Sequence, residues 1–144
     1  MIKVAGMWEQ GWNTPFLEHD LWEYPLRDFQ VEQHYMVPVT GIDKPVTERT
    51  SIDEVIKENP ELTVVWVDEY GDIPLQEFVH PENVLYIAGK TTSRPMVQFK
   101  KPGDFSVRIE TKSDGSNQGM IWSHQAILLV LYDRLRKNGI NSNR

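Results

Sequence analysis

Three short segments of the chain are almost continuously apolar, and they constrain its fold more than any other feature. They cover residues 2–5, 64–67 and 84–88. A strand with one solvated face alternates apolar and polar side chains, whereas a strand of a parallel sheet is covered on both faces and is apolar along its length. The three segments therefore predict an α/β fold, with a parallel sheet and helices on both of its faces.

The sequence between these segments supplies the other elements of such a fold. Further strands are expected at residues 34–39 and 105–109, and helices at residues 14–29, 51–58 and 123–138. Ser51 is followed three residues later by Glu54, which is the spacing of a capping box and favours a helix start there. Pro25 should kink or end the first helix, because proline cannot donate the helical hydrogen bond.

One connection departs from the regular alternation of strands and helices. Residues 89–104 join two expected strands, but they contain Pro95 and Pro102 and show no helical period. Neighbouring parallel strands normally need a crossover helix. We therefore expect no helix of two or more turns between Thr91 and Lys101, and long connections of this kind are usually functional.

Composition limits the class of protein. The 144 residues fit one domain spanning 1–144, and the absence of cysteine excludes disulfides and thiolate chemistry. The formal charge of −6 argues against binding nucleic acid by bulk attraction. No segment approaches the ~18 apolar residues of a membrane span. A cytoplasmic protein with no membrane partner is expected.

Gly89, Lys90 and Thr91 follow an expected strand, as in a phosphate-binding loop. Such a loop needs another glycine five positions earlier, where this chain has Val84. A nucleotide phosphate loop is therefore not favoured. A glycine at the carboxyl end of a strand still allows a ligand to approach the backbone closely.

The four histidines do not have metal-ligand spacing, and no metal is expected. His124 lies in the first turn of the last helix, where the positive end of the helix dipole favours the neutral imidazole. That form suits a proton acceptor. The alternative is a structural role, with Ser123 as the helix cap beside a packed histidine.

Three features of the second half occur together: a strand that ends at Gly89, a strand that runs into Glu110, and an apolar last helix opened by residues 121–126. With them, the segment 63–138 resembles the SPOUT superfamily of RNA methyltransferases, most closely its SpoU-type branch. The resemblance implies a C-terminal trefoil knot, S-adenosylmethionine as methyl donor, and tRNA or rRNA as substrate. It implies methylation of a ribose 2′-hydroxyl.

The resemblance also assigns site residues. The loops 89–93, 109–111 and 120–123 would line the donor pocket, and the residues expected to bind the cofactor are Gly89, Thr91, Ile109, Ile121 and Ser123. A cation near the developing alkoxide should stabilise the transition state. Arg27 is the expected catalytic cation, with His124 as the second catalytic residue.

Some family positions differ in this chain. SpoU-type enzymes have an acidic residue in the glycine loop, where this chain has Lys90, and an asparagine near Trp122. Their N-terminal Asn-x-Gly-x-x-x-Arg stretch is not matched, because Asn13 and Arg27 lie too far apart. A catalytically silent SPOUT-like binding protein and a base-methylating SPOUT branch therefore stay open as alternatives, as does an unknotted flavodoxin-like domain.

Two further expectations concern Gly89 and the last helix. Gly89→Val should abolish donor binding and leave the fold largely intact, because the side chain would fill space left for the ligand. The last helix is expected to bury a stripe of Ala126, Ile127, Val130, Leu131 and Leu135. Apolar residues on its other sides, Leu128, Leu129 and Tyr132, predict a homodimer in which Arg27 acts on the partner's donor pocket.

Overall fold

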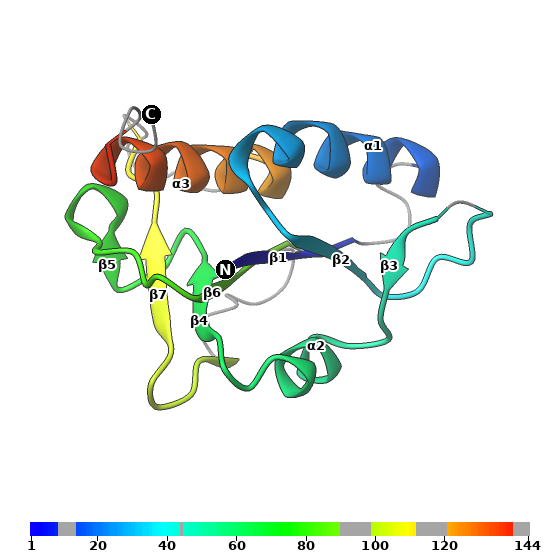
Figure 1. Ribbon diagram of the computed structural model, residues 1–144, viewed down its shortest axis with the longest axis horizontal. Helices are drawn as coiled ribbons and strands as arrows, with labels where there is room; N and C mark the ends of the chain where they lie inside the picture. The colour runs from blue at the N-terminus through cyan, green and yellow to red at the C-terminus, as the bar shows by residue number, and fades with distance from the viewer. Residues whose placement is uncertain (9–13, 44, 90–98, 112–120, 140–144) are drawn as a thin grey trace.

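The sheet is parallel throughout, as the apolar segments predict. The computed structural model describes residues 1–8, 14–43, 45–89, 99–111 and 121–139. Within them, seven strands pair in the order β3-β2-β1-β6-β4-β7-β5 (Figure 1). They are β1 (Ile2–Met7), β2 (Gln33–Val37), β3 (Thr47–Glu48), β4 (Thr63–Val67), β5 (Ile73–Pro74), β6 (Val84–Ala88) and β7 (Phe105–Arg108). The five expected strands are confirmed, and the two-residue strands β3 and β5 add the edges.

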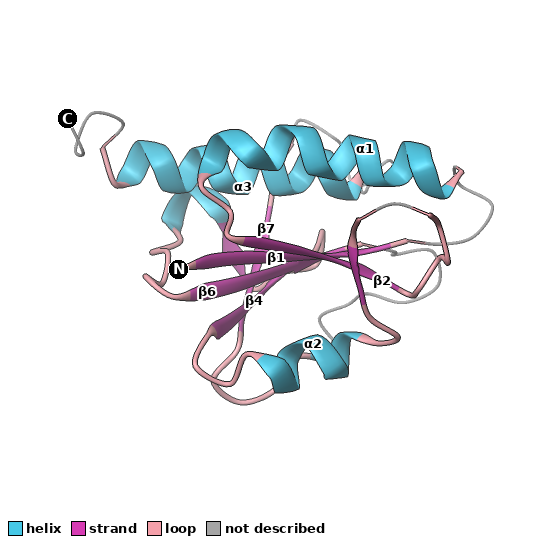
Figure 2. Cartoon of the chain, turned by 45° about the vertical axis from the view of Figure 1, so that its right-hand side comes forward, coloured by secondary structure: helices cyan, strands magenta, loops and turns pink. Residues whose placement is uncertain are grey.

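Helices cover both faces of the sheet, so the fold is α/β as expected. The helices α1 (Pro15–Leu26) and α3 (Ser123–Lys137) lie on one face, and α2 (Ile52–Glu58) lies on the other (Figure 1, Figure 2). Successive residues of β1 point to opposite faces, so Val4 belongs to the core under α1 and α3 and Ala5 to the core over α2. Two short 3₁₀ helices, η1 (Arg27–Phe29) and η2 (Leu75–Glu77), complete the described elements.

The helix starts follow the sequence signals. The Ser51 hydroxyl accepts a hydrogen bond from the Glu54 N–H at 3.2 Å, which caps α2. Thr14 caps α1 in the same way, with Pro15 in the first turn. Pro25 lies inside α1, which ends one residue later and tightens into η1. The break that was expected at Pro25 is therefore a change from α-helix to 3₁₀ helix.

A close approach of α1 to β1 depends on Gly6. A Cβ atom at Gly6 would lie 2.9 Å from the indole of Trp22, so only glycine leaves room for that ring. Trp22 is fully buried, and its Nε1–H donates to Glu18 Oε1 at 2.9 Å. This contact sets the height of α1 above the sheet.

The buried stripe of α3 differs from the expected one at its end. Ile127, Val130 and Leu131 are buried as expected, but Ala126 is only partly buried and Leu135 is 37% exposed. Arg134 is buried in its place and donates to the carbonyls of Pro81 and Glu82 at 2.5 and 3.1 Å. Those carbonyls precede β6, where an arginine can satisfy them and a leucine cannot. The last turn of α3 therefore lies at the amino edge of the sheet.

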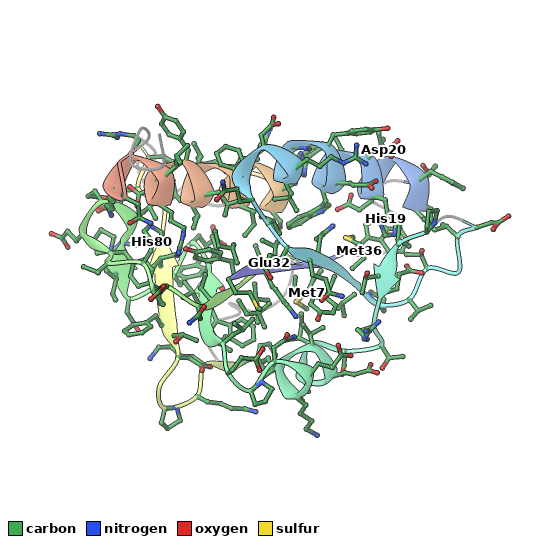
Figure 3. The ribbon with its side chains drawn as sticks, viewed as in Figure 1. Met7, His19, Asp20, Glu32, Met36 and His80 are labelled. Carbon is green, nitrogen blue, oxygen red and sulfur yellow. The ribbon has the colours of Figure 1, made fainter. Side chains whose placement is uncertain are left out.

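His80 anchors the same part of α3 (Figure 3). Its Nδ1 lies 2.7 Å from the Tyr86 hydroxyl, and its Nε2 lies 2.7 Å from Asp133 Oδ2. Burial lowers the pKa of His80, although the Asp133 carboxylate opposes the shift. Lys137 Nζ lies 2.8 Å from the same carboxylate. This network fixes the direction of α3 and so the position of its first turn.

Two expectations depend on residues outside this description. Residues 90–98 and 112–120 lie outside the described ranges, and with them the trefoil knot and most of the helix-free connection.

Of the helices that the structure describes, none has the length and apolar character that crossing a bilayer requires.

Candidate functional site

The end of β6 and the start of α3 meet at the carboxyl edge of the sheet. The Ser123 hydroxyl donates a hydrogen bond to the Gly89 carbonyl at 2.8 Å. Ser123 thus joins the start of α3 to the end of β6 by a hydrogen bond, and it is not the helix cap. The N-cap is Trp122, whose N–H donates to Gln125 Oε1 at 3.0 Å. Open parallel sheets bind ligands at this edge, so Gly89 and Ser123 form the centre of the candidate site.

Gly89 is required by packing inside the protein. A Cβ atom at Gly89 would lie 2.3 Å from Met7 Cβ and 2.8 Å from the Met7 backbone N and Cα. The space that the sequence interpretation left for a ligand is therefore occupied by β1. The expectation that Gly89→Val keeps the fold intact is wrong, because even an alanine side chain overlaps β1.

His124 lies in the first turn of α3 between two tryptophans. Its ring makes edge contacts with Trp22 and Trp122, with centroids 6.3 and 5.7 Å away. Burial lowers the pKa of His124, and the Glu18 carboxylate opposes this shift. The imidazole is thus neutral near pH 7, in the form that can accept a proton.

Two of the other expected cofactor residues, Ile109 and Ile121, border the same edge. Ile109 follows the last residue of β7 and packs partly buried against the core. Ile121 is partly exposed and precedes the α3 cap. Thr91 lies outside the described residues.

Arg27 is not at this edge within one chain. It follows the last residue of α1, about 7 Å along the helix axis beyond Trp22, in the direction of the amino edge. Its guanidinium is exposed, donates to Glu23 Oε1 at 3.0 Å and lies over the Tyr24 ring. The structure thus does not bring Arg27 and His124 together in a single subunit.

Sequence reasoning missed a group of polar side chains beneath α1. His19 is buried, and its Nε2 lies 3.5 Å from Glu48 Oε2 (Figure 3). Burial alone would raise the pKa of Glu48, but hydrogen bonds from Thr40 outweigh it and the pKa is lowered. His34 stacks on Trp22 with ring centroids 5.4 Å apart. A usable signal was the spacing, because His19 is six positions after Asn13, as the arginine is in the family stretch.

The turn after β4 is the second feature that sequence reasoning missed. β4 lies between β6 and β7 in the sheet, and Asp68 and Glu69 follow its last residue at the carboxyl edge. Two adjacent carboxylates directly after a buried strand are a signal that the sequence contains. Among the described residues, no group of three or more His, Asp or Glu side chains is placed to hold a metal ion.

Comparison with known proteins identifies the fold. No protein-family model and no curated protein sequence matches this chain. The structure, however, superposes on the SpoU methyltransferase AviRb from Streptomyces viridochromogenes, solved in complex with AdoMet (S-adenosylmethionine), with a TM-score of 0.72 and 14% identity. The match covers 100% of this chain and 59% of that chain. The chain has the SpoU-type methyltransferase fold.

Two further solved structures are similar to this chain over most of its length. One concerns the 2-OH methylation of C/U34 on tRNA; it has a TM-score of 0.70 and 11% identity, and the match covers 96% of each chain. The other is the TrmH/SpoU tRNA modifying enzyme of A. aeolicus, with a TM-score of 0.67, 10% identity, and coverage of 96% of this chain and 77% of that one. The SpoU-type fold therefore extends over nearly the whole chain, including α1 and β1, which the sequence resemblance did not cover.

Proposed function

We propose that this chain is an S-adenosylmethionine-dependent RNA methyltransferase that methylates a ribose 2′-hydroxyl of tRNA or rRNA. The observation that carries the proposal is the SpoU-type fold over the whole chain, with Ser123 hydrogen-bonded to Gly89 where such sheets bind ligands. One structural neighbour holds AdoMet, and another concerns 2-OH methylation of tRNA. We place the enzyme in the cytoplasm and the knot in the chain around residues 90–120.

The residues at the carboxyl edge fit the methyl donor. AdoMet supplies an electrophilic methyl group on a sulfonium. Ile109 and Ile121 offer partly exposed apolar surface for an adenine ring, and a buried carboxylate oxygen of Glu69 lacks a hydrogen-bond partner among the described residues. We assign Gly89, Thr91 and Ser123 to backbone and hydroxyl contacts with the same ligand.

Two side chains have roles in the transfer. A ribose hydroxyl is a weak acid, so its attack needs a proton acceptor and a charge that stabilises the developing alkoxide. His124 is neutral and accepts the proton. Arg27 stabilises the alkoxide in the partner's site, since it lies away from the carboxyl edge of its own chain.

The homodimer forms through the outer side of α3. Leu129, Tyr132 and Leu135 are exposed there by 44%, 48% and 37%. Apolar side chains in one stripe of a helix are typical of a covered surface. A two-fold contact of α3 with α3 covers the stripe in both copies.

We expect sedimentation at micromolar concentration to give a species of twice 16.8 kDa. The double variant Leu129→Glu and Tyr132→Glu should sediment at half that mass with an unchanged circular dichroism spectrum. Val79→Glu is the matched control, because Val79 is 85% exposed and lies outside α3. A monomeric wild-type protein would contradict the dimer and the shared role of Arg27.

Transfer of a labelled methyl group from AdoMet to tRNA and rRNA, followed by nucleoside analysis, tests the function. We expect 2′-O-methylnucleosides, and His124→Ala should lower the rate by about 10²-fold or more through loss of the proton acceptor. Labelled bases would support the base-methylating alternative. Binding of RNA and donor without transfer would support the catalytically silent one.

A further inference from the structure

The turn at residues 68–71 is held rigidly between the ends of two strands. The Asp68 N–H donates to the Val107 carbonyl at 3.0 Å, which continues the pairing of β4 with β7. A Cβ atom at Gly71 would lie 2.4 Å from the Val107 carbonyl carbon, so the turn lies directly on β7. Because β6 borders β4 on the other side, this turn leaves the sheet between the strands that lead to Gly89 and to Ile109.

Glu69 is the unusual residue of this turn. Its Oε2 atom is buried and has no hydrogen-bond partner among the described residues. Burial raises the pKa of Glu69, and the neighbouring charge of Asp68 adds to the shift. Asp68 itself is used within the turn, since its Oδ1 accepts from the Tyr70 N–H at 2.8 Å. In the part of the chain that the structure describes, the geometry thus explains Asp68 and leaves Glu69 Oε2 without a donor.

A buried carboxylate oxygen without a donor destabilises a protein, because it has lost water and gained nothing in return. A ligand that donates hydrogen bonds removes that penalty when it binds. AdoMet has hydrogen-bond donors at its ammonium group, its adenine amino group and its ribose, and only the ribose offers hydroxyls on two adjacent carbons. Two adjacent hydroxyls match the two oxygens of one carboxylate.

We propose that Glu69 binds the methyl donor by accepting hydrogen bonds from the ribose hydroxyls of its adenosine. This inference rests on the proposed function and deepens it. It assigns the recognition of the nucleoside to the turn after β4, between the two loops that the sequence resemblance assigns to the donor. The recognised ligand class is a ribonucleoside, with or without a sulfonium.

Glu69→Gln tests the assignment, with Glu61→Gln as matched control. Glu61 is exposed and lies just before β4, so the control makes the same change at the other end of the same strand. Calorimetry would measure the Kd of AdoMet, S-adenosylhomocysteine and 5′-methylthioadenosine, which all contain the ribose. Thermal unfolding would be followed on the same proteins without ligand.

We expect Glu69→Gln to weaken all three ligands by about tenfold or more, as for a lost charge-assisted hydrogen bond. Its unfolding midpoint without ligand should stay the same or rise, because the carboxylate whose Oε2 atom is buried without a donor is no longer charged. The control should match the wild type in both measurements. A lowered midpoint with unchanged Kd values would show a structural role. Weakening of AdoMet alone would show a contact to the sulfonium, and weakening of AdoMet and S-adenosylhomocysteine without 5′-methylthioadenosine would show a contact to the ammonium group. Each of these results overturns the inference. A wild-type protein that binds none of the ligands would contradict the proposed function as well.

Discussion

Gly89→Ala is expected to lower the free energy of unfolding by about 3 kcal/mol or more, the upper range for overpacking a core. The added Cβ would lie 2.3 Å from Met7 Cβ and 2.8 Å from two Met7 backbone atoms. β1 and β6 are adjacent near the middle of the sheet, so neither strand can shift without disturbing its other neighbour. Urea denaturation at pH 7 would measure the change.

Gly103→Ala is the control that separates crowding from backbone strain. Gly103 has a φ of +94° and no atom within 4 Å of its Cβ position, so alanine there meets strain alone, worth about 1–3 kcal/mol. Gly89 is not among the glycines with positive φ. A stable Gly89→Ala protein that fails to bind AdoMet would contradict this account and would show that the space at the Gly89 Cβ position is left for the ligand.

Acidification from pH 7 to pH 5 is expected to remove about 2 kcal/mol of stability through His34 alone. Burial, with the charge of His19 adding to it, lowers the pKa of His34 to about 3. Its Nε2 is buried without a hydrogen-bond partner among the described residues. In the unfolded chain the imidazole titrates near 6.5, so only the unfolded state gains a proton between pH 6.5 and pH 3. The contribution of His34 to the free energy of unfolding is therefore fully present above pH 6.5 and is lost as the pH falls.

His34→Phe isolates this contribution, because the phenyl ring keeps the stacking on Trp22 and cannot titrate. The pKa values of His80 and His124 are also lowered by burial, so the variant should retain a weaker acid dependence. Urea unfolding between pH 5 and pH 6.5 would measure how steeply the free energy of unfolding changes with pH. This slope should be smaller in the variant than in the wild type by the equivalent of about one proton. Equal slopes in the two proteins would contradict the buried, neutral state of His34.

Much of the fold follows from local sequence signals. The continuous apolar runs indicated a parallel sheet, and Ser51 marked the start of α2, because both effects depend on neighbours in sequence. The edge strands β3 and β5 have two residues each and carry no periodic pattern. Arg134 is buried where Leu135 was expected, because the carbonyls of Pro81 and Glu82 accept hydrogen bonds from it there. The sequence does not show where these carbonyls lie.

The candidate site was only partly predictable. A glycine at a strand end and a serine before a helix indicated the carboxyl edge, and the structure joins them through one hydrogen bond. The reason for Gly89 could not be predicted, because it depends on the register of β1 against β6. The sequence does contain the pair of carboxylates that includes Glu69. Its place between Gly89 and Ile109, however, depends on the order of β6, β4 and β7 in the sheet, which the sequence does not give.

Isothermal titration of the wild-type protein with S-adenosylmethionine tests the central claim most directly. The proposed methyltransferase should bind the donor with a Kd in the micromolar range, at one site per chain. The absence of measurable binding at millimolar ligand, in a protein that is folded by circular dichroism, would contradict the claim. It would leave a SpoU-type fold used for something other than methyl transfer.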